Sequence, residues 1–259
     1  MILQNAEEFY NSNKIEKKEQ DRPFYEYFRT VYSQFGEDGI LEAILKKLNT
    51  ENNYYVEFGA GNGIHISNTA YLRINKNWNG LLLEGDINKI PVDSSINLHH
   101  EMVYSDNINY LFEKYNVPSK FGLLSVDIDG DDAYVLDEID LNRFSPDVII
   151  VEFNPGLPNH IGIKIKEQKS NLSNGDLHER GYIGCNLREL YNILENKSYK
   201  FVTTVSVNAI FVKSELFNLL DIEDLSKEEI MSIHSYPSGY DDWKSYILKY
   251  NDDWIITNK

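Results

Sequence analysis

The sequence predicts an α/β fold: a doubly wound, mostly parallel seven-stranded sheet with an antiparallel hairpin at one edge. Strand-like and helix-like segments alternate from residue 54 onward, which is typical of a parallel sheet with helices on its faces. Strand-like runs such as Leu81–Leu83 and Val148–Val151 are continuously apolar, as expected where helices cover both faces. A short connection between the last two strand-like runs predicts the edge hairpin.

The expected strands are short apolar runs at residues 54–58, 80–84, 100–104, 121–127, 147–153, 199–205 and 207–213. Apolar residues at i, i+4 spacing predict an amphipathic helix over 40–48. Further helices are expected at residues 67–75, 107–115, 132–140 and 186–196. An irregular stretch of roughly thirty residues follows residue 153, and a loop of that length in a compact domain is more often functional than not.

The chain divides into three expected parts. Residues 1–32 form an N-terminal arm or helix, residues 33–213 form the main domain, and residues 214–259 form a small C-terminal appendage packed on it. The appendage is acidic and aromatic, and a helical structure is expected there. It is also where we would look for a homodimer contact.

Charge and cysteine content narrow the class of protein. A formal net charge of −16 argues against a nucleic-acid or anionic-membrane partner, since both need a basic footprint. The one cysteine, Cys185, excludes an intramolecular disulfide and fits a reducing compartment. Neither a signal-peptide core nor a window of membrane-spanning length is present in the sequence. We therefore expect a soluble, cytoplasmic protein.

A glycine-rich turn follows the first expected strand. The run Tyr54–Phe58 contains Glu57, and glycines follow at 59, 61 and 63. A dinucleotide fingerprint, G-x-G-x-x-G, would need glycine at position 64, where this chain has Ile64. A carboxylate next to a run of glycines, whose backbone a ligand can approach closely, instead suits a ligand with hydroxyls and an ammonium, such as S-adenosylmethionine. A glycine turn that binds nothing is the alternative.

Acidic residues fall at the ends of four expected strands: Glu57, Glu84, Asp127 with Asp129, and Glu152. Ligands of open α/β sheets bind at these carboxyl ends. We expect Glu84 to accept the ribose hydroxyl hydrogens and, on weaker grounds, Asp106 to accept from an adenine amino group. With 41 acidic residues in the chain, one or two such positions would arise by coincidence.

The segment from Asp127 to Asp132 resembles the start of a calcium loop, but the glycine required at position 6 is replaced by Asp132. On a strand, the side-chain period of two would place Asp127 and Asp129 on one side. We predict that Asp129, Glu152 and Asn154 form an all-oxygen site for Mg²⁺, Mn²⁺ or Ca²⁺. The alternative is that these acids cap the next helix or orient a substrate hydroxyl directly.

The stretch after Asn154 concentrates imidazoles and cations: His160, Lys164, Lys166, Lys169, His178 and Arg180. We expect His178 to serve as general base, with His160 as a weaker alternative and His65 as a further candidate. The cations Lys164 and Arg180, with the imidazole of His160, are expected to bind the substrate, and the cations would meet a pyrophosphate. The alternative is that each of these residues is an ordinary surface group with no role in binding or catalysis.

Several segments together carry a resemblance to a known family: SQFGEDG at 33–39, VEFGA at 56–60, SNT at 67–69, GLLLEGD at 80–86, SVDIDG at 125–130, VEFN at 151–154 and VNAIFV at 207–212. In their order and spacing, over roughly residues 30–213, the chain resembles class I S-adenosylmethionine-dependent methyltransferases of the FkbM-like type. The resemblance implies a Rossmann-like methyltransferase fold and O-methylation of a sugar hydroxyl. A nucleotide-activated heptose or hexose of surface polysaccharide biosynthesis is the expected acceptor.

These motifs, together with the strand-end and loop arguments above, give the expected site residues. The expected cofactor-binding residues are Gln34, Glu37, Glu57, Gly59, Gly61, Asn68, Glu84 and Asp106, and the expected catalytic residues are His178, Asp127 and Asp129. Related sugar methyltransferases hold a divalent metal at the ends of the fourth and fifth strands, but often with consecutive acids, whereas Phe153 separates Glu152 from Asn154 here. A nucleotide-dependent oxidoreductase on the same sheet and a catalytically silent cofactor-binding scaffold are the alternatives.

Overall fold

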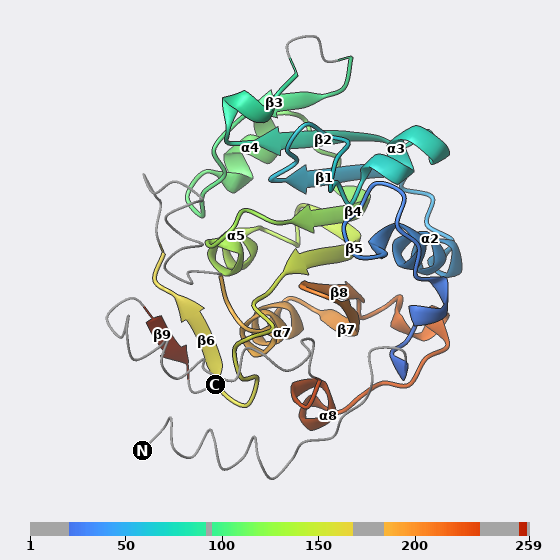
Figure 1. Cartoon of the computed structure of the whole chain (residues 1–259), viewed down its shortest axis with the longest axis vertical. Coiled ribbons are helices and arrows are strands. Elements are labelled where there is room, and N and C mark those ends of the chain that lie inside the picture. The colour runs from blue at the N-terminus through green and yellow to red at the C-terminus, as the bar shows by residue number, and fades with distance from the viewer. Residues whose placement is uncertain (1–20, 92–94, 168–183, 234–253, 258–259) are drawn as a thin grey trace.

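The computed structural model describes residues 21–91, 95–167, 184–233 and 254–257. Its main sheet has seven strands in the order β3-β2-β1-β4-β5-β8-β7 (Figure 1). The strands are β1 Tyr54–Phe58, β2 Asn79–Glu84, β3 Leu98–His100, β4 Lys120–Val126, β5 Ser145–Glu152, β7 Tyr199–Val205 and β8 Asn208–Lys213. All neighbours from β3 to β5 are parallel, and β8 is antiparallel to both β5 and β7. The predicted mostly parallel sheet with an antiparallel edge hairpin is therefore confirmed.

Helices cover both faces of this sheet (Figure 1). They are α2 Glu37–Leu48, α3 Ala70–Lys76, α4 Ile108–Lys114, α5 Asp132–Glu138 and α7 Leu187–Asn196, with short 3-10 turns η2 Tyr25–Tyr27, η3 Ile87–Lys89 and η4 Phe217–Leu220. Apolar residues of α2 and α3 pack on one face of the strands, and those of α4, α5 and α7 pack on the other. This two-sided packing explains why Leu81, Leu82 and Leu83 are all fully buried.

Three features differ from the sequence-based expectation. β3 lies at 98–100 rather than 100–104, since Leu98 pairs with Leu82 of β2 and the chain leaves the sheet after His100. A second sheet pairs β6 Gly162–Ile165 with β9 Trp254–Thr257, so the stretch after residue 153 is not wholly irregular. The appendage, in its described part, contains helix α8 Lys227–Met231 and strand β9, so it is not purely helical.

Figure 1 shows that the parallel strands end together at one edge of the main sheet. Gly59, directly after β1, has φ +66, and a Cβ added there would overlap the backbone carbonyl oxygen of Asp127. Only glycine allows this close approach. The turn after β1 and the loop after β4 are therefore in direct backbone contact. Within the ranges described, no helix is long and apolar enough to cross a membrane.

Candidate active site

Glu84, the last residue of β2, faces the glycine turn after β1. Its carboxylate accepts from the Gly61 N–H at 2.6 Å and from the Asp86 N–H at 2.7 Å, and the residue is 4% exposed. Gly61 has φ +55, and a Cβ built there meets nothing within 4 Å. The turn thus presents open space beside a carboxylate that the backbone has already oriented, which is the geometry expected of a cofactor site.

Glu57, on β1, is also buried, but its hydrogen bonds are directed within the protein. It accepts from the Ser67 hydroxyl at 2.7 Å, the Asn68 N–H at 2.8 Å and the Thr69 hydroxyl at 2.5 Å. Burial raises the pKa of Glu57, and these donors oppose the rise. In this structure Glu57 organises the loop that leads into α3, and the Asn68 amide donates from that loop to the Ser125 hydroxyl at 3.2 Å.

The N-terminus of α2 is held against the start of β8, where Asn208 pairs with Glu152 of β5. Glu37 is fully buried and accepts from the Phe35 N–H at 2.7 Å and from the Asn208 amide of β8 at 2.9 Å. The next residue, Asp38, accepts three backbone N–H groups, those of residues 31–33. Gln34 is exposed on this segment, and Asp106 is exposed beyond β3. The contact between Glu37 and Asn208 could not be read from the sequence, because the two residues are far apart along the chain.

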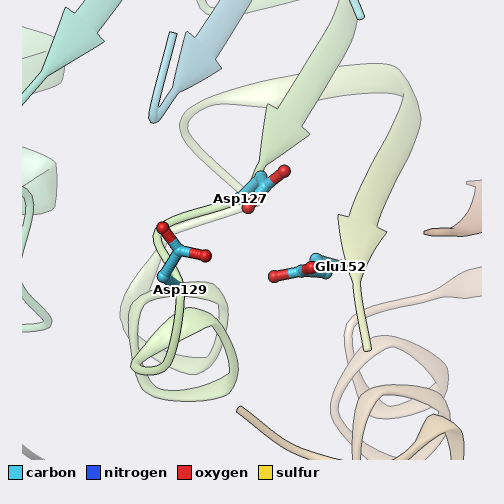
Figure 2. Close-up of side chains that lie close together, drawn as sticks. All are labelled: Asp127, Asp129 and Glu152. Carbon is cyan, nitrogen blue, oxygen red and sulfur yellow. The ribbon is translucent and has the colours of Figure 1, made fainter. Parts of the chain in front are cut away.

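Three carboxylates meet at the ends of β4 and β5. One oxygen from each of Asp127, Asp129 and Glu152 lies within 4.8 Å of the others, and all three residues are partly exposed (Figure 2). The sequence argument placed Asp127 and Asp129 on a strand, and this was wrong: β4 ends at Val126, and Asp129 has φ +58. Their convergence comes from the loop instead. The side-chain oxygen of Asn154 accepts from the Gly156 N–H at 2.9 Å, which uses part of its capacity as an acceptor.

Burial and neighbouring acids raise the pKa values of Asp127 and Glu152. Burial, with the neighbouring Asp132 and Asp129 carboxylates, raises the pKa of Asp127 to about 8. Burial and the same acidic surroundings raise the pKa of Glu152 well above its usual range, and the two side chains are hydrogen-bonded to each other. Two adjacent carboxyl groups cannot easily both ionise, so burial and mutual repulsion favour the protonated form of this pair when no cation is bound.

The structure describes only some of the residues predicted as general base or as substrate-binding. His178 and Arg180, with Lys169, lie outside the described residues. Burial, with the nearby Arg188 charge, lowers the pKa of His160 to about 4, so its imidazole is neutral at pH 7. The Lys164 ammonium lies 2.8 Å from a Glu189 carboxylate oxygen and over the Tyr134 ring, so its charge is offset within the protein.

No protein-family model matches the chain, and no curated protein matches it. The solved structures that the chain is similar to include two methyltransferases. One is a SAM dependent methyltransferase from Aquifex aeolicus, at 13% identity and TM-score 0.27, covering 66% of this chain and 86% of that one. The other is geranyl diphosphate C-methyltransferase from Streptomyces coelicolor A3(2) in complex with Mg²⁺, geranyl diphosphate and S-adenosyl-L-homocysteine, at 13% identity and TM-score 0.32, covering 97% and 94%.

Proposed function

We propose that this chain is an S-adenosylmethionine-dependent O-methyltransferase that methylates a sugar hydroxyl, with nucleotide-activated heptoses or hexoses as the acceptor class. The observation that carries the proposal is the backbone contact between Gly59 and Asp127. This contact brings the glycine turn, which is hydrogen-bonded to Glu84, next to the loop of Asp127 and Asp129. The part of the site that would bind the cofactor (the cofactor half) therefore adjoins the part that would bind the acceptor (the acceptor half). The motif order along the chain supports the sugar acceptor.

In the cofactor half, Glu84 would accept the ribose hydroxyl hydrogens. A carboxylate offers about four acceptor positions, and the N–H groups of Gly61 and Asp86 each occupy one. The open space above Gly61 would receive the cofactor. Glu57 and Asn68 would act by shaping the loop before α3, while Gln34 and Asp106 would contact the cofactor from the exposed rim.

In the acceptor half, the donor set fits a hard divalent cation, which prefers oxygen ligands. Asp127, Asp129 and Glu152 would hold Mg²⁺ or Mn²⁺, with Asn154 as a further proposed ligand. Such an ion, when bound, lowers the pKa of a coordinated hydroxyl and fixes its orientation. A divalent cation would also offset the burial and like-charge repulsion that raise the pKa values of Asp127 and Glu152.

The reaction would be an in-line displacement. The sugar oxygen forms a bond to the methyl carbon while the carbon–sulfur bond breaks, leaving S-adenosylhomocysteine, and the hydroxyl proton passes to a base. The protein must align oxygen, carbon and sulfur and accept that proton. The backbone carbonyl of Asp127 lies against Gly59 of the glycine turn. His178, Asp127 and Asp129 are the proposed bases that would take the proton.

The test is to incubate the protein with methyl-labelled S-adenosylmethionine and a panel of nucleotide sugars, including heptoses, with Mg²⁺, Mn²⁺ or EDTA. We expect label in one class of sugar and none with EDTA. Cofactor binding by calorimetry without label in any sugar would contradict the sugar acceptor. No binding of S-adenosylmethionine would contradict the methyltransferase assignment itself.

A further inference from the structure

Asp132, the first residue of α5, is hydrogen-bonded to the loop that carries Asp127 and Asp129. It is 1% exposed. Its Oδ1 accepts from the Ile128 N–H at 2.8 Å, and its Oδ2 accepts from the Gly130 N–H at 2.9 Å. Gly184 packs against the same carboxylate, because a Cβ built there would lie 3.6 Å from Oδ2. One buried side chain therefore satisfies two backbone donors of a single short loop.

The loop after β4 has an unusual backbone that needs such a partner. Asp129 has φ +58 and Gly130 has φ +154, so two consecutive residues depart from the strand conformation. A non-glycine residue in the left-handed region costs about 1–2 kcal/mol and persists only where its surroundings hold it. The two N–H groups bound by Asp132 flank Asp129 on either side, so the carboxylate fixes the backbone at this position.

Without such a constraint, electrostatics would separate the acids. One oxygen from each of Asp127, Asp129 and Glu152 lies within 4.8 Å of the others, so ionising all three carboxyl groups would drive them apart if the loop were free to move. We infer that Asp132 is a positioning residue: by binding the backbone on both sides of Asp129, it holds Asp127 and Asp129 converged on Glu152 as a preorganised site for a divalent cation. This inference rests on the metal site of the proposed function.

The side-chain chemistry explains why aspartate is needed at this position. Both backbone partners are donors, and a carboxylate offers an acceptor oxygen to each. An asparagine would offer one oxygen and turn an NH₂ group toward the other N–H, leaving a buried donor without a partner. Asn has nearly the same shape as Asp, yet Asp132→Asn should lose one of the two hydrogen bonds that hold the loop.

The experiment measures Mn²⁺ binding by calorimetry to the wild type and to Asp132→Asn, with thermal unfolding to confirm that each is folded. Loss of a residue that orients metal ligands typically lowers metal affinity by about 10–100-fold, so we expect at least a tenfold loss. S-adenosylmethionine affinity should stay within threefold, since Glu84 and Gly61 are untouched. An Asp132→Asn protein that is folded and binds Mn²⁺ within twofold of wild type overturns the inference.

Asp147→Asn is the matched control. Asp147 is a buried aspartate near the start of β5, where it accepts from the Thr50 hydroxyl and the Asn52 amide and lies 3.5 Å from the Lys213 ammonium. Like Asp132→Asn, the Asp147→Asn variant removes the charge of a buried aspartate. Its Mn²⁺ affinity should stay within twofold of wild type. An equal loss of affinity in the control would overturn a specific role for Asp132.

Asp132→Glu decides the question if Asp132→Asn does not fold. Glutamate keeps both acceptors and the charge but extends them by one methylene, so we expect a folded protein with at least threefold weaker Mn²⁺ binding. Wild-type affinity in this variant would overturn the inference. If the wild-type protein itself binds no Mn²⁺, the proposed metal site and the inference fall together, whereas methyl transfer without metal would leave the methyltransferase assignment standing.

Discussion

Replacing Glu84 with alanine should weaken binding of S-adenosylmethionine by about 100-fold. Glu84 already accepts one backbone N–H on each oxygen. Since a carboxylate has about four acceptor positions, about two remain for the ribose hydroxyls. A hydrogen bond to a charged group contributes about 1.5–3 kcal/mol, so two contribute at least about 3 kcal/mol. At about 1.4 kcal/mol per tenfold change, this corresponds to about 100-fold in the dissociation constant.

The assay is calorimetric titration with S-adenosylmethionine or S-adenosylhomocysteine. Glu84→Gln keeps one acceptor oxygen but places an NH₂ group against a backbone N–H, so its affinity should fall between wild type and alanine. Glu113→Ala is the control, because Glu113 is exposed on α4 and pairs only with the exposed Arg143 among the partners that the structure shows. Its affinity should stay within twofold of wild type. A folded Glu84→Ala protein that binds within threefold of wild type would remove Glu84 from the ribose role.

Three further predictions follow from the same edge of the sheet. Gly59→Ala should lower the free energy of unfolding, measured with denaturant, by more than about 3 kcal/mol, because its Cβ would overlap the Asp127 carbonyl. Gly61→Ala should lower it by about 1 kcal/mol, because Gly61 has a positive φ, and should also weaken cofactor binding. Equal unfolding curves for the two variants would contradict the close approach at Gly59. The pKa of Asp127 is raised to about 8, so the folded protein holds a proton that the unfolded chain has lost; metal-free stability should fall as pH rises from about 4 to about 8, and Asp127→Asn should flatten that slope. A wild-type slope unchanged by Asp127→Asn would show that this carboxyl does not titrate as stated. Glu152→Ala should remove the activity that Mn²⁺ supports in the wild type, and turnover that persists in EDTA would refute the metal site.

Local patterns in the sequence predicted the main sheet well. β1 occupies the expected residues 54–58, and β7 the expected residues 199–205. These runs are apolar and bounded by turn residues, so neighbouring residues alone favour a strand. By contrast, β6 and β9 are four-residue strands from distant parts of the chain, and each is a strand only because it pairs with the other. Runs of four residues are too short to show a period, so the sequence argument did not predict them.

The sequence by itself determined which residue types stand at the carboxyl ends of the strands. It placed Glu57, Glu84 and Glu152 there, because strand ends can be read from short apolar runs. Tertiary structure alone decided what each carboxylate faces. Glu57 faces the Ser67–Thr69 loop, Glu84 faces the glycine turn, and Glu152 faces Asp127 across neighbouring strands.

The loop after β4 shows the physical reason for this division. The period of a strand would have placed Asp127 and Asp129 on one side, but the chain leaves the strand at Val126 and turns through a left-handed residue. A buried carboxylate, Asp132, accepts the N–H groups that this turn exposes. Local sequence determines conformations that neighbouring residues favour. The strained loop also depends on packing against a distant segment, because the Asp127 carbonyl lies against Gly59, and on the burial of the Asp132 carboxylate.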